Sequence, residues 1–393
     1  MQEVTETHNM VKRVKMQIRL FKPSVGQEEL SNIRLVFDRA WLGLGPLVAE
    51  FEKEWSEYLN VSSSVGVNSG TAALHLALMA YGFRPGSKVL VPAITFVSTA
   101  TAVLYNHLKP VFVDVDPDTL SISMRDLETK LDSKCVALIP VHFGGHPVPM
   151  EQLMEIAKRH RLAVIEDCAH CAGGAYKGKK LGTWGDIGCF SFEEKKCMTT
   201  GDGGMLSSDA VDLIEPVRAY RWVGIDKDTW RRSAGYTDTQ SLDVRHWYYE
   251  VSKLGYKYNM NDLMAAIGLA QLKKLDRMNE RRRVIIRRYL DGIKDCQQIR
   301  PLLPYALQDA AYWIFGVRCN RRDDLIAHLK QKGIATGVHY MPIPLHPLFR
   351  SYDKAIPAAK QVWQTILTLP LFPDLTDVEV DYVVDALCEF DRQ

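Results

Sequence analysis

The fold is decided by five stretches of the sequence: KVLVPA (88–93), PVFVDVD (110–116), CVALIPV (135–141), LAVIEDC (162–168) and IGCFSF (187–192). All five are apolar and rich in β-branched residues, which indicates buried strands. Helix-period segments lie between several of them, for example LETKL at 127–131 and MEQLMEIAKRHR at 150–161. This alternation is typical of a largely parallel sheet covered by helices, so we predict an α/β fold.

Helices are also predicted on both sides of these strands. From Glu28 to Leu59 the apolar positions recur at spacings of three and four, and the turn signal GLGP at 43–46 interrupts them, which favours two helices around a loop. From about Asn261 the sequence is helical through 264–290, with charges on one face and aliphatic residues on the other. Such a helix could join two domains.

The C-terminal part predicts a smaller α+β unit. It contains the strand-like YWIFGVRC at 312–319, the helical DDLIAHLKQKG at 323–333 and a final helix after the turn FPDLT at 372–376. At 393 residues the chain exceeds the size at which one core usually stops growing. We therefore predict a flexible N-terminus at 1–16, a large α/β domain with a mostly parallel mixed sheet at 17–260, and the linking helix with a small α+β domain at 261–393.

Composition argues against several classes of partner. The 49 basic residues nearly balance the 47 acidic ones, and no basic block is long enough to follow a phosphate backbone, which argues against nucleic acid. No segment reaches the roughly 18 apolar residues that cross a bilayer, and the polar opening lacks the apolar core of a signal peptide. We expect a cytoplasmic protein without a membrane partner.

The eight cysteines, from Cys135 to Cys388, show no disulfide-framework spacing, which fits reduced thiols. Cys168 and Cys171 form a lone CxxC motif, and such a motif is weak evidence without its structural context. We interpret this pair as buried thiols and expect no metal site.

Three segments carry residues that one ligand could use together, because ligands of open α/β sheets collect beyond the carboxyl ends of the strands. In VNSGTAALHLALMAYG (67–82), Ser69, Gly70 and Thr71 precede a helix, where free backbone amides favour a phosphate group. A simple helix cap is the alternative. Asp167 closes an apolar strand, where its carboxylate could keep a pyridine nitrogen protonated or could cap the next helix.

The third segment is GDIGCFSFEEKKCMTTGDGGML at 185–206, in which a strand leads into a polar turn with Lys195 and Lys196. A lysine at the mouth of a crevice can form a Schiff base when desolvation or nearby positive charge lowers its pKa. Taken alone, the segment fits a solvated surface lysine better. A phosphate loop, a strand-end aspartate and a lysine, in this chain order, are the three parts that anchor pyridoxal phosphate.

The sequence resembles the DegT/DnrJ/EryC1/StrS family of pyridoxal-phosphate-dependent sugar aminotransferases, which have fold type I. The resemblance covers nearly the whole chain and rests on these motifs: GPLVAEFEKEW, SGTAAL, PAITFVSTA, PVFVDVD, PVHFGGHP, EDCAH, YKGKKLGTWGD, FSFEEKKCMTTGDGG, GYKYNMNDLMAAIGLAQL, TGVHYMPIPLH and LPLFPDLT. Agreement at so many separated points is a specific signal. It implies a large pyridoxal-phosphate-binding domain and a smaller C-terminal domain.

The resemblance also implies roles for individual residues. A serine five positions before the lysine selects Lys196 rather than Lys195 as the Schiff-base residue and general acid/base. The other residues carried over for the cofactor are Gly70, Thr71 and Ser191 at the phosphate, Phe96 stacked on the ring, Asp167 at the ring nitrogen and His170 near the ring hydroxyl. A core phenylalanine and a core or loop histidine are the alternatives for Phe96 and His170.

In the family, residues of the GYKYN segment reach the phosphate of the neighbouring subunit, which implies a homodimer with shared active sites. Here the candidates are Lys257 and Asn259, and the departure from the commoner GYNYR leaves the choice between them open. His339, Tyr340 and His346 are candidates for the substrate side, with structural roles as the alternative. The segment 226–250 is either a lid over the substrate or a surface insertion.

The resemblance implies transfer of an amino group from glutamate to a keto sugar, with pyridoxamine phosphate as the intermediate form of the cofactor. A nucleotide-linked 4-keto-6-deoxy sugar, for polysaccharide or glycoside synthesis, is the substrate expected first, and a 3-keto sugar or another polyhydroxy ketone is the alternative. Relatives that dehydrate sugars carry histidine at the lysine position, so Lys196 argues against that reaction. A different pyridoxal-phosphate enzyme of this fold and a non-catalytic binding protein are further alternatives, the latter disfavoured by intact Asp167, Ser191 and Lys196.

Overall fold

The computed structural model describes residues 16–225, 249–352 and 355–393. Its centre is a seven-stranded sheet in the order β1-β9-β8-β5-β4-β2-β3. The strands are β1 (Ser63–Val67), β2 (Lys88–Pro92), β3 (Lys109–Val113), β4 (Cys135–Leu138), β5 (Ala163–Asp167), β8 (Ile187–Ser191) and β9 (Gly204–Ser208). The five stretches that predicted strands are β2, β3, β4, β5 and β8, which pair in parallel. Only β9 runs antiparallel to its neighbours β1 and β8, so the predicted mostly parallel mixed sheet is confirmed.

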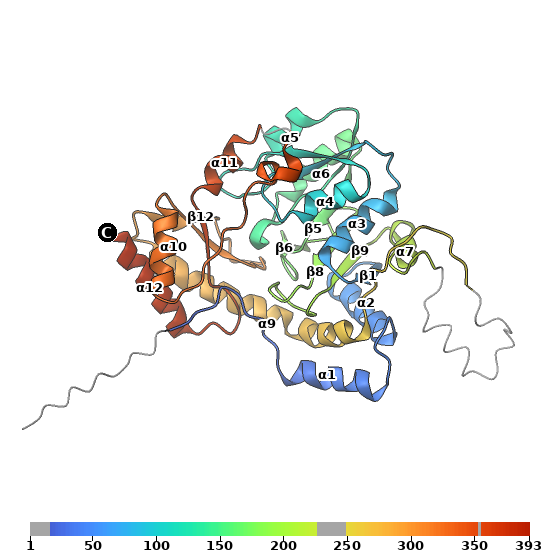
Figure 1. Ribbon diagram of the computed structural model, residues 1–393, viewed down its shortest axis with the longest axis horizontal. Coiled ribbons are helices and arrows are strands. Elements are labelled where there is room, and N and C mark those ends of the chain that lie inside the picture. The colour runs from blue at the N-terminus through green and yellow to red at the C-terminus, as the bar shows by residue number, and fades with distance from the viewer. Residues whose placement is uncertain (1–15, 226–248, 353–354) are drawn as a thin grey trace, which may run out of the picture.

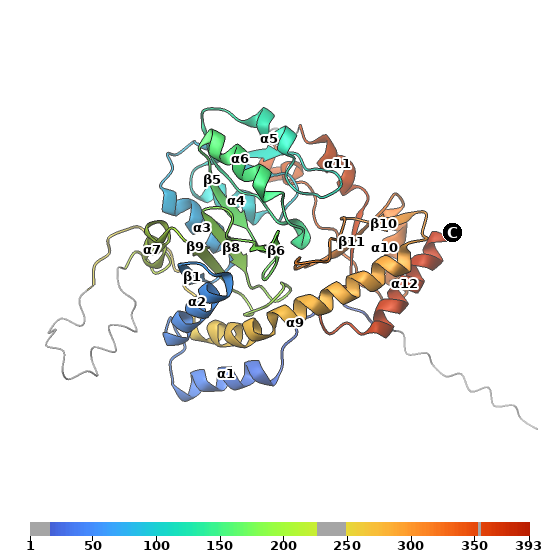
Figure 2. The ribbon, with the colours of Figure 1, turned by 180° about the vertical axis from the view of Figure 1, so that it is seen from behind.

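Helices cover both faces of this sheet (Figures 1 and 2). One face packs against α3 (Gly70–Tyr81), α4 (Ser98–Tyr105) and α7 (Val211–Tyr220). The other face packs against α5 (Met124–Lys130) and α6 (Met150–His160) over one half, and against α2 (Pro46–Leu59) and α9 (Asp262–Ile293) over the other. Successive side chains of β8 point to opposite faces of the sheet. Cys189 packs in the core on the side of α3, α4 and α7, and Phe190 packs in the core on the side of α2 and α9.

The long helix α9 covers the stretch 264–290, for which the sequence predicted a helix. Asn261 caps its start by accepting a hydrogen bond from the backbone N–H of Met264 at 2.9 Å. Figure 1 shows α9 running from beneath the large sheet towards the small one, with α1 (Gln27–Asp38) alongside it. The loop predicted between two N-terminal helices separates α1 from α2.

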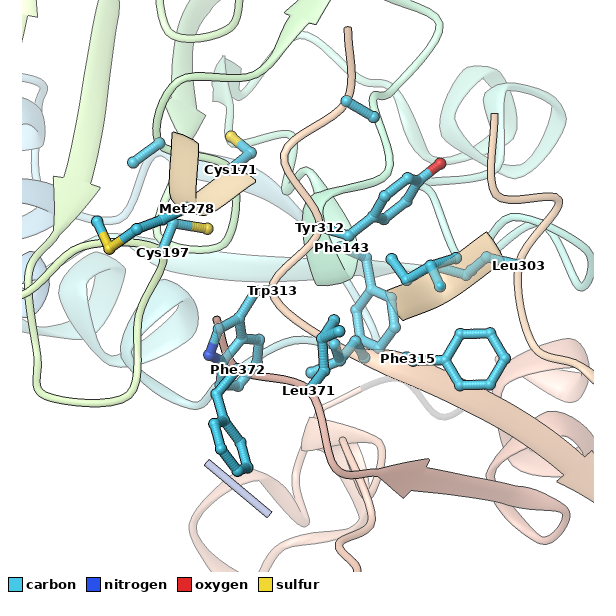
Figure 3. Packing of buried hydrophobic residues seen from close by; sticks show 14 of the residues in the cluster. Phe143, Cys171, Cys197, Met278, Leu303, Tyr312, Trp313, Phe315, Leu371 and Phe372 are labelled. Carbon is cyan, nitrogen blue, oxygen red and sulfur yellow. The ribbon is translucent and has the colours of Figure 1, made fainter. Parts of the chain in front are cut away.

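The small unit is built on an antiparallel three-stranded sheet in the order β10-β11-β12. Its elements are β10 (Ile299–Pro301), β11 (Phe315–Cys319), α10 (Arg322–Gln331), α11 (Pro357–Trp363), β12 (Ile366–Leu369) and α12 (Asp377–Asp391). A two-stranded ribbon of β6 (Ala175–Tyr176) and β7 (Lys179–Lys180) completes the sheets. Figure 3 shows the core beside β11, where Phe143 of the large unit packs with Leu303, Tyr312 and Phe315.

The segment just before α1 pairs with the small unit. The Ile18 N–H donates to the Gly333 carbonyl at 2.9 Å, and the Ala335 N–H donates to the Ile18 carbonyl at 2.9 Å. The Leu371 N–H likewise donates to the Leu20 carbonyl at 3.2 Å. These bonds hold Arg19 and Phe21 at the junction of the two units.

Two predictions fall largely on residues outside the described ranges: the flexible N-terminus at 1–16 and the lid or insertion at 226–250. Among the residues that the structure places, no helix combines the length and the apolar character needed to span a bilayer.

Candidate active site

A cavity of about 720 Å³ opens at the carboxyl ends of β5 and β8, between the large and small units. Side chains from the N-terminal segment, the large sheet and the small unit line it together. They include Arg19, Phe21, Ser69, Gly70, Thr71, Phe96, Thr99, Asp167, His170, Ser191, Glu193, Lys195, Lys196, Trp313, His339 and Tyr340. The crevice beyond the strand ends, where the sequence analysis expected a ligand, is therefore present.

One end of the cavity is the N-terminus of α3. The Ser69 hydroxyl caps this helix by accepting from the Ala72 N–H at 3.0 Å, so the helix-cap interpretation holds for Ser69. The first turn still presents Gly70 and Thr71, whose amides have no intrahelical acceptor, and the helix dipole favours an anion there. A Cβ on Gly70 would lie 2.7 Å from the Ser191 Cβ, so glycine is needed for α3 to approach β8 this closely. The two predicted phosphate segments thus meet.

Asp167 lies at the floor of the cavity and is 4% exposed. Its Oδ2 accepts from the Thr99 hydroxyl at 2.8 Å, and its Oδ1 accepts from the Ala169 N–H at 3.1 Å. Burial raises the pKa of Asp167, whereas the Thr99 and Ala169 hydrogen bonds and Lys196 act in the opposite direction. A buried carboxylate of this kind is stabilised by a cationic ligand group that contacts it.

Lys196 and Lys195 both line the cavity, but their surroundings differ. Burial lowers the pKa of Lys196 to about 8, partly opposed by the carboxylates of Glu193 and Asp167. Lys195 is exposed and lies 3.7 Å from the Glu193 carboxylate. A lysine with a lowered pKa is more often neutral at neutral pH, which a nucleophilic amine requires.

Phe96 and His170 flank this centre in different ways. Phe96 is 51% exposed in the cavity wall, so the structure does not place it as a core phenylalanine. His170 is buried and stacks on Trp313 with ring centroids 4.2 Å apart. Its Nδ1 accepts from the Gly144 N–H at 3.4 Å, and burial holds its pKa well below the usual range. His170 is therefore neutral, with its proton on Nε2, which lies 3.5 Å from the Tyr340 hydroxyl.

The remaining predicted residues are divided between the cavity and the surface. His339 and Tyr340 line the cavity, and His346 does not. Lys257 and Asn259 also lie outside it, where the Lys257 ammonium contacts the Asn259 Oδ1 at 2.9 Å. Their segment runs beside the phosphate end, since the Tyr258 carbonyl accepts from the Asn68 N–H at 2.7 Å.

Arg19, Thr99 and Trp313 are among the cavity residues that the sequence analysis missed. Thr99 is within the quoted motif PAITFVSTA, yet no local signal separates it from the neighbouring Thr95. Arg19 and Trp313 belong to segments that are distant in sequence from the strand ends, and only the tertiary structure brings them to the cavity.

The motif pair Cys168 and Cys171 is fully buried, and with His142 its ligand atoms lie within 4.8 Å of one another. Burial raises the pKa of both thiols. Both ring nitrogens of His142 already have partners, Glu166 at 3.0 Å and the Val148 N–H at 3.1 Å. These contacts fit the interpretation as buried thiols.

Comparison with known proteins identifies the family. The DegT/DnrJ/EryC1/StrS aminotransferase family matches residues 23–388. The chain belongs to this family. It is 38% identical to the spore coat polysaccharide biosynthesis protein SpsC of Bacillus subtilis, over 93% of this chain and 95% of that protein.

Solved structures agree with this assignment. The sugar aminotransferase CalS13 from Micromonospora echinospora is 30% identical, with a TM-score of 0.85 over 95% of this chain and all of that one. Spr1654 from Streptococcus pneumoniae, solved in its PMP form, is 27% identical, with a TM-score of 0.88 over 96% of this chain and 99% of that one. The protein is a pyridoxal-phosphate-dependent aminotransferase of fold type I.

The residues present fit this cofactor. The cavity combines a helix N-terminus for a phosphate, a buried carboxylate for a protonated ring nitrogen, and an amine with a lowered pKa for an aldehyde carbon. The surroundings of Asp167 also favour a protonated pyridine ring. Its buried carboxylate accepts hydrogen bonds from two neutral donors, Thr99 and Ala169, so a cation on the cavity side would stabilise its negative charge.

Proposed function

We propose that this enzyme transfers an amino group from glutamate to a nucleotide-linked 4-keto-6-deoxy sugar. The observation that carries the proposal is the location of Lys196: its amine, with a pKa lowered to about 8, shares one cavity with the buried carboxylate of Asp167. The sugar is supported by CalS13, a sugar aminotransferase, and by SpsC, a polysaccharide biosynthesis protein. A 3-keto sugar or another polyhydroxy ketone remains the second candidate substrate.

Bound pyridoxal phosphate supplies an electron sink that stabilises negative charge on the carbon that loses a proton. Lys196 holds the cofactor through its Nζ and, once released, uses the same atom to move a proton to and from the substrate carbon. A pKa near 8 suits both tasks, because the amine gives up and accepts a proton readily near neutral pH.

The other predicted residues bind and orient the cofactor. We assign the phosphate to the first turn of α3 with Gly70, Thr71 and Ser191, which the structure brings together at one end of the cavity. Asp167 keeps the ring nitrogen protonated, and Thr99 orients its carboxylate.

Aromatic and imidazole groups complete the ring site. Phe96 offers its exposed face to the cofactor ring, a contact worth about 0.5–1.5 kcal/mol beyond burial. Neutral His170 offers its Nε2 proton near the ring hydroxyl. His339 and Tyr340 contact the substrate from the small unit.

Anionic groups of the two substrates need cationic partners. Apart from Lys196, the lysine and arginine side chains lining the cavity within the described ranges are Arg19 and Lys195, both exposed. We assign the carboxylates of glutamate and the diphosphate of the sugar nucleotide to this side of the cavity, since guanidinium and ammonium groups bind such oxyanions.

We further propose that the enzyme is a homodimer with shared active sites. Lys257 is exposed and Asn259 is half-buried on the segment that flanks the phosphate end. A side chain of this segment would then complete the phosphate site of the neighbouring subunit. The Lys257 ammonium is the stronger candidate because it carries a positive charge.

The proposal is tested by the visible absorption spectrum of the purified enzyme before and after addition of glutamate. We expect a cofactor band that fades as the amino group is transferred. Lys196→Ala should abolish both the band and the transfer, whereas the matched variant Lys195→Ala should retain the band. A Lys196→Ala variant with a normal spectrum and normal turnover would refute the assignment of Lys196. Screening of keto sugars with the wild-type enzyme identifies the acceptor.

A further inference from the structure

We propose that Trp313 is a positioning residue for Lys196. The indole ring of Trp313 holds the Lys196 ammonium group, and the indole N–H of Trp313 fixes the backbone next to Lys196. The inference rests on the proposed role of Lys196. It assigns a function to a residue of the small unit that the sequence analysis did not single out.

Two separate contacts join Trp313 to the lysine segment. The Lys196 Nζ lies 4.0 Å from the centroid of the Trp313 ring, within the range of a cation–π interaction. The Trp313 Nε1–H donates to the Lys195 carbonyl at 2.7 Å. One contact places the amine and the other places the peptide unit next to it, so together they restrict the directions in which Lys196 can extend.

Trp313 can act in this way because its own position is fixed. It is 4% exposed, and its backbone N–H donates to the Gly144 carbonyl at 2.9 Å. Its ring stacks on His170 at 4.2 Å and on Phe21 at 5.2 Å, with interplanar angles of 13° and 4°. Figure 3 shows it within the packed cluster that also holds Phe143 and Phe372. The indole therefore links the N-terminal segment and the small unit to the catalytic loop.

The aromatic ring acts on the charge of the amine in a known direction. The negative face of an indole ring attracts an ammonium group but not a neutral amine, and the attraction is stronger away from water. Burial lowers the pKa of Lys196, so Trp313 opposes the effect of burial. The titratable or charged groups that also face Lys196 are Glu193, Lys195 and Cys197 of its own loop, Asp167 at the end of β5, His170 after β5, His339 of the small unit and Arg282 of α9.

The chemical consequence concerns the released lysine. Lys196 must leave the cofactor, carry a proton and return it without drifting out of reach. An aromatic face beside the amine keeps the ammonium form within the cavity. A rotamer-rich lysine side chain would otherwise explore many positions at each release.

The test measures the protonation of Lys196 directly, using the cofactor-free full-length protein. Acetylation by acetic anhydride is followed from pH 6 to 11 by mass spectrometry of the peptide that contains both lysines, with Lys195 as the internal control. Trp313→Leu keeps an apolar side chain but removes the ring, so we expect the Lys196 midpoint to fall by about one pH unit while the Lys195 midpoint stays unchanged. An unchanged or higher Lys196 midpoint would overturn the inference.

Trp313→Phe provides a second, milder variant that keeps a ring and removes the N–H. We expect a smaller fall of the midpoint and a lower kcat for the glutamate half-reaction, with KM for glutamate unchanged. Trp184→Phe, a tryptophan that does not line the cavity, should match the wild type in every measurement. Wild-type kcat and wild-type labelling in Trp313→Phe would contradict the positioning role.

The same labelling separates this inference from the proposed function. Pyridoxal phosphate should protect Lys196 of the wild type, but not Lys195, from acetylation. Absence of protection would refute the proposed role of Lys196. Protection of the wild type, combined with wild-type titration in both Trp313 variants, would refute only the role of Trp313.

Discussion

Replacing Thr99 with valine should reveal how strongly the enzyme depends on an ionised Asp167. The Thr99 hydroxyl donates to the Asp167 Oδ2 at 2.8 Å, and both side chains are buried. Valine has nearly the same shape as threonine but has no hydroxyl, so the carboxylate keeps the Ala169 N–H and loses its other neutral donor. Because burial already raises the pKa of Asp167, loss of this bond should raise it further.

The magnitude follows from the strength of the bond. A hydrogen bond to a charged group contributes about 1.5–3 kcal/mol, which corresponds to about one to two pH units at 1.36 kcal/mol per unit. Asp167 must be ionised to hold the proton on the ring nitrogen, so activity is lost as the pH falls through its pKa. The acid limb of the pH profile should therefore move to higher pH in Thr99→Val by about one to two units.

The assay is stopped-flow absorbance of the glutamate half-reaction, recorded across the pH range for wild type and variant. Thr101→Val, on the same helix α4, is the matched control, because the Thr101 hydroxyl donates to the Ser98 carbonyl at 3.4 Å and not to Asp167. The control should keep the wild-type acid limb. If Thr99→Val shows the same acid limb as wild type, Thr99 does not set the ionisation of Asp167 and the reasoning fails.

Two further predictions concern packing and charge. Gly70→Ala would place a Cβ 2.7 Å from the Ser191 Cβ, and overpacking of this kind costs about 1–3 kcal/mol. We expect pyridoxal phosphate binding, measured by equilibrium dialysis, to weaken about tenfold. The control Gly43→Ala, which has open space at its Cβ, should bind the cofactor normally. Normal binding by Gly70→Ala would exclude this close approach as a requirement. Glu52→Gln should destabilise the protein by about 3–5 kcal/mol in urea unfolding, because the buried Glu52 carboxylate pairs with Arg218 at 2.6 Å and with the buried Arg221. The control Glu50→Gln changes an exposed residue and should alter stability little. Equal unfolding midpoints for the two variants would contradict this prediction.

Much of the fold follows from local sequence patterns. The stretches at 88–93 and 162–168 predict strands because β-branched residues fit an extended, buried backbone, and they form β2 and β5. The helix predicted from about Asn261 forms α9, whose start is fixed by the local Asn261 cap. Parallel strands also bring their carboxyl ends to one edge, which is why Asp167 and Ser191 could be expected at one site.

Other features could not be predicted because they depend on which surfaces meet. Phe96 lies in an apolar stretch that suits a core residue equally well, and only the tertiary structure leaves its ring 51% exposed in the cavity. Lys195 and Lys196 are adjacent and chemically identical, and the difference in their surroundings arises from packing: Lys195 is exposed, whereas Lys196 is half-buried and desolvation lowers its pKa to about 8.

The sequence by itself determined the α/β fold, the family resemblance and the residue types at the cofactor site, because periodicity and motifs are properties of short segments. Only the tertiary structure decided that Trp313 lies against Lys196 and that Arg19 lines the same cavity. These contacts join segments far apart in the chain, and their positions follow from how the small unit and the N-terminal segment dock on the large sheet. Docking is set by the sum of many weak packing contacts, which no single stretch of sequence contains.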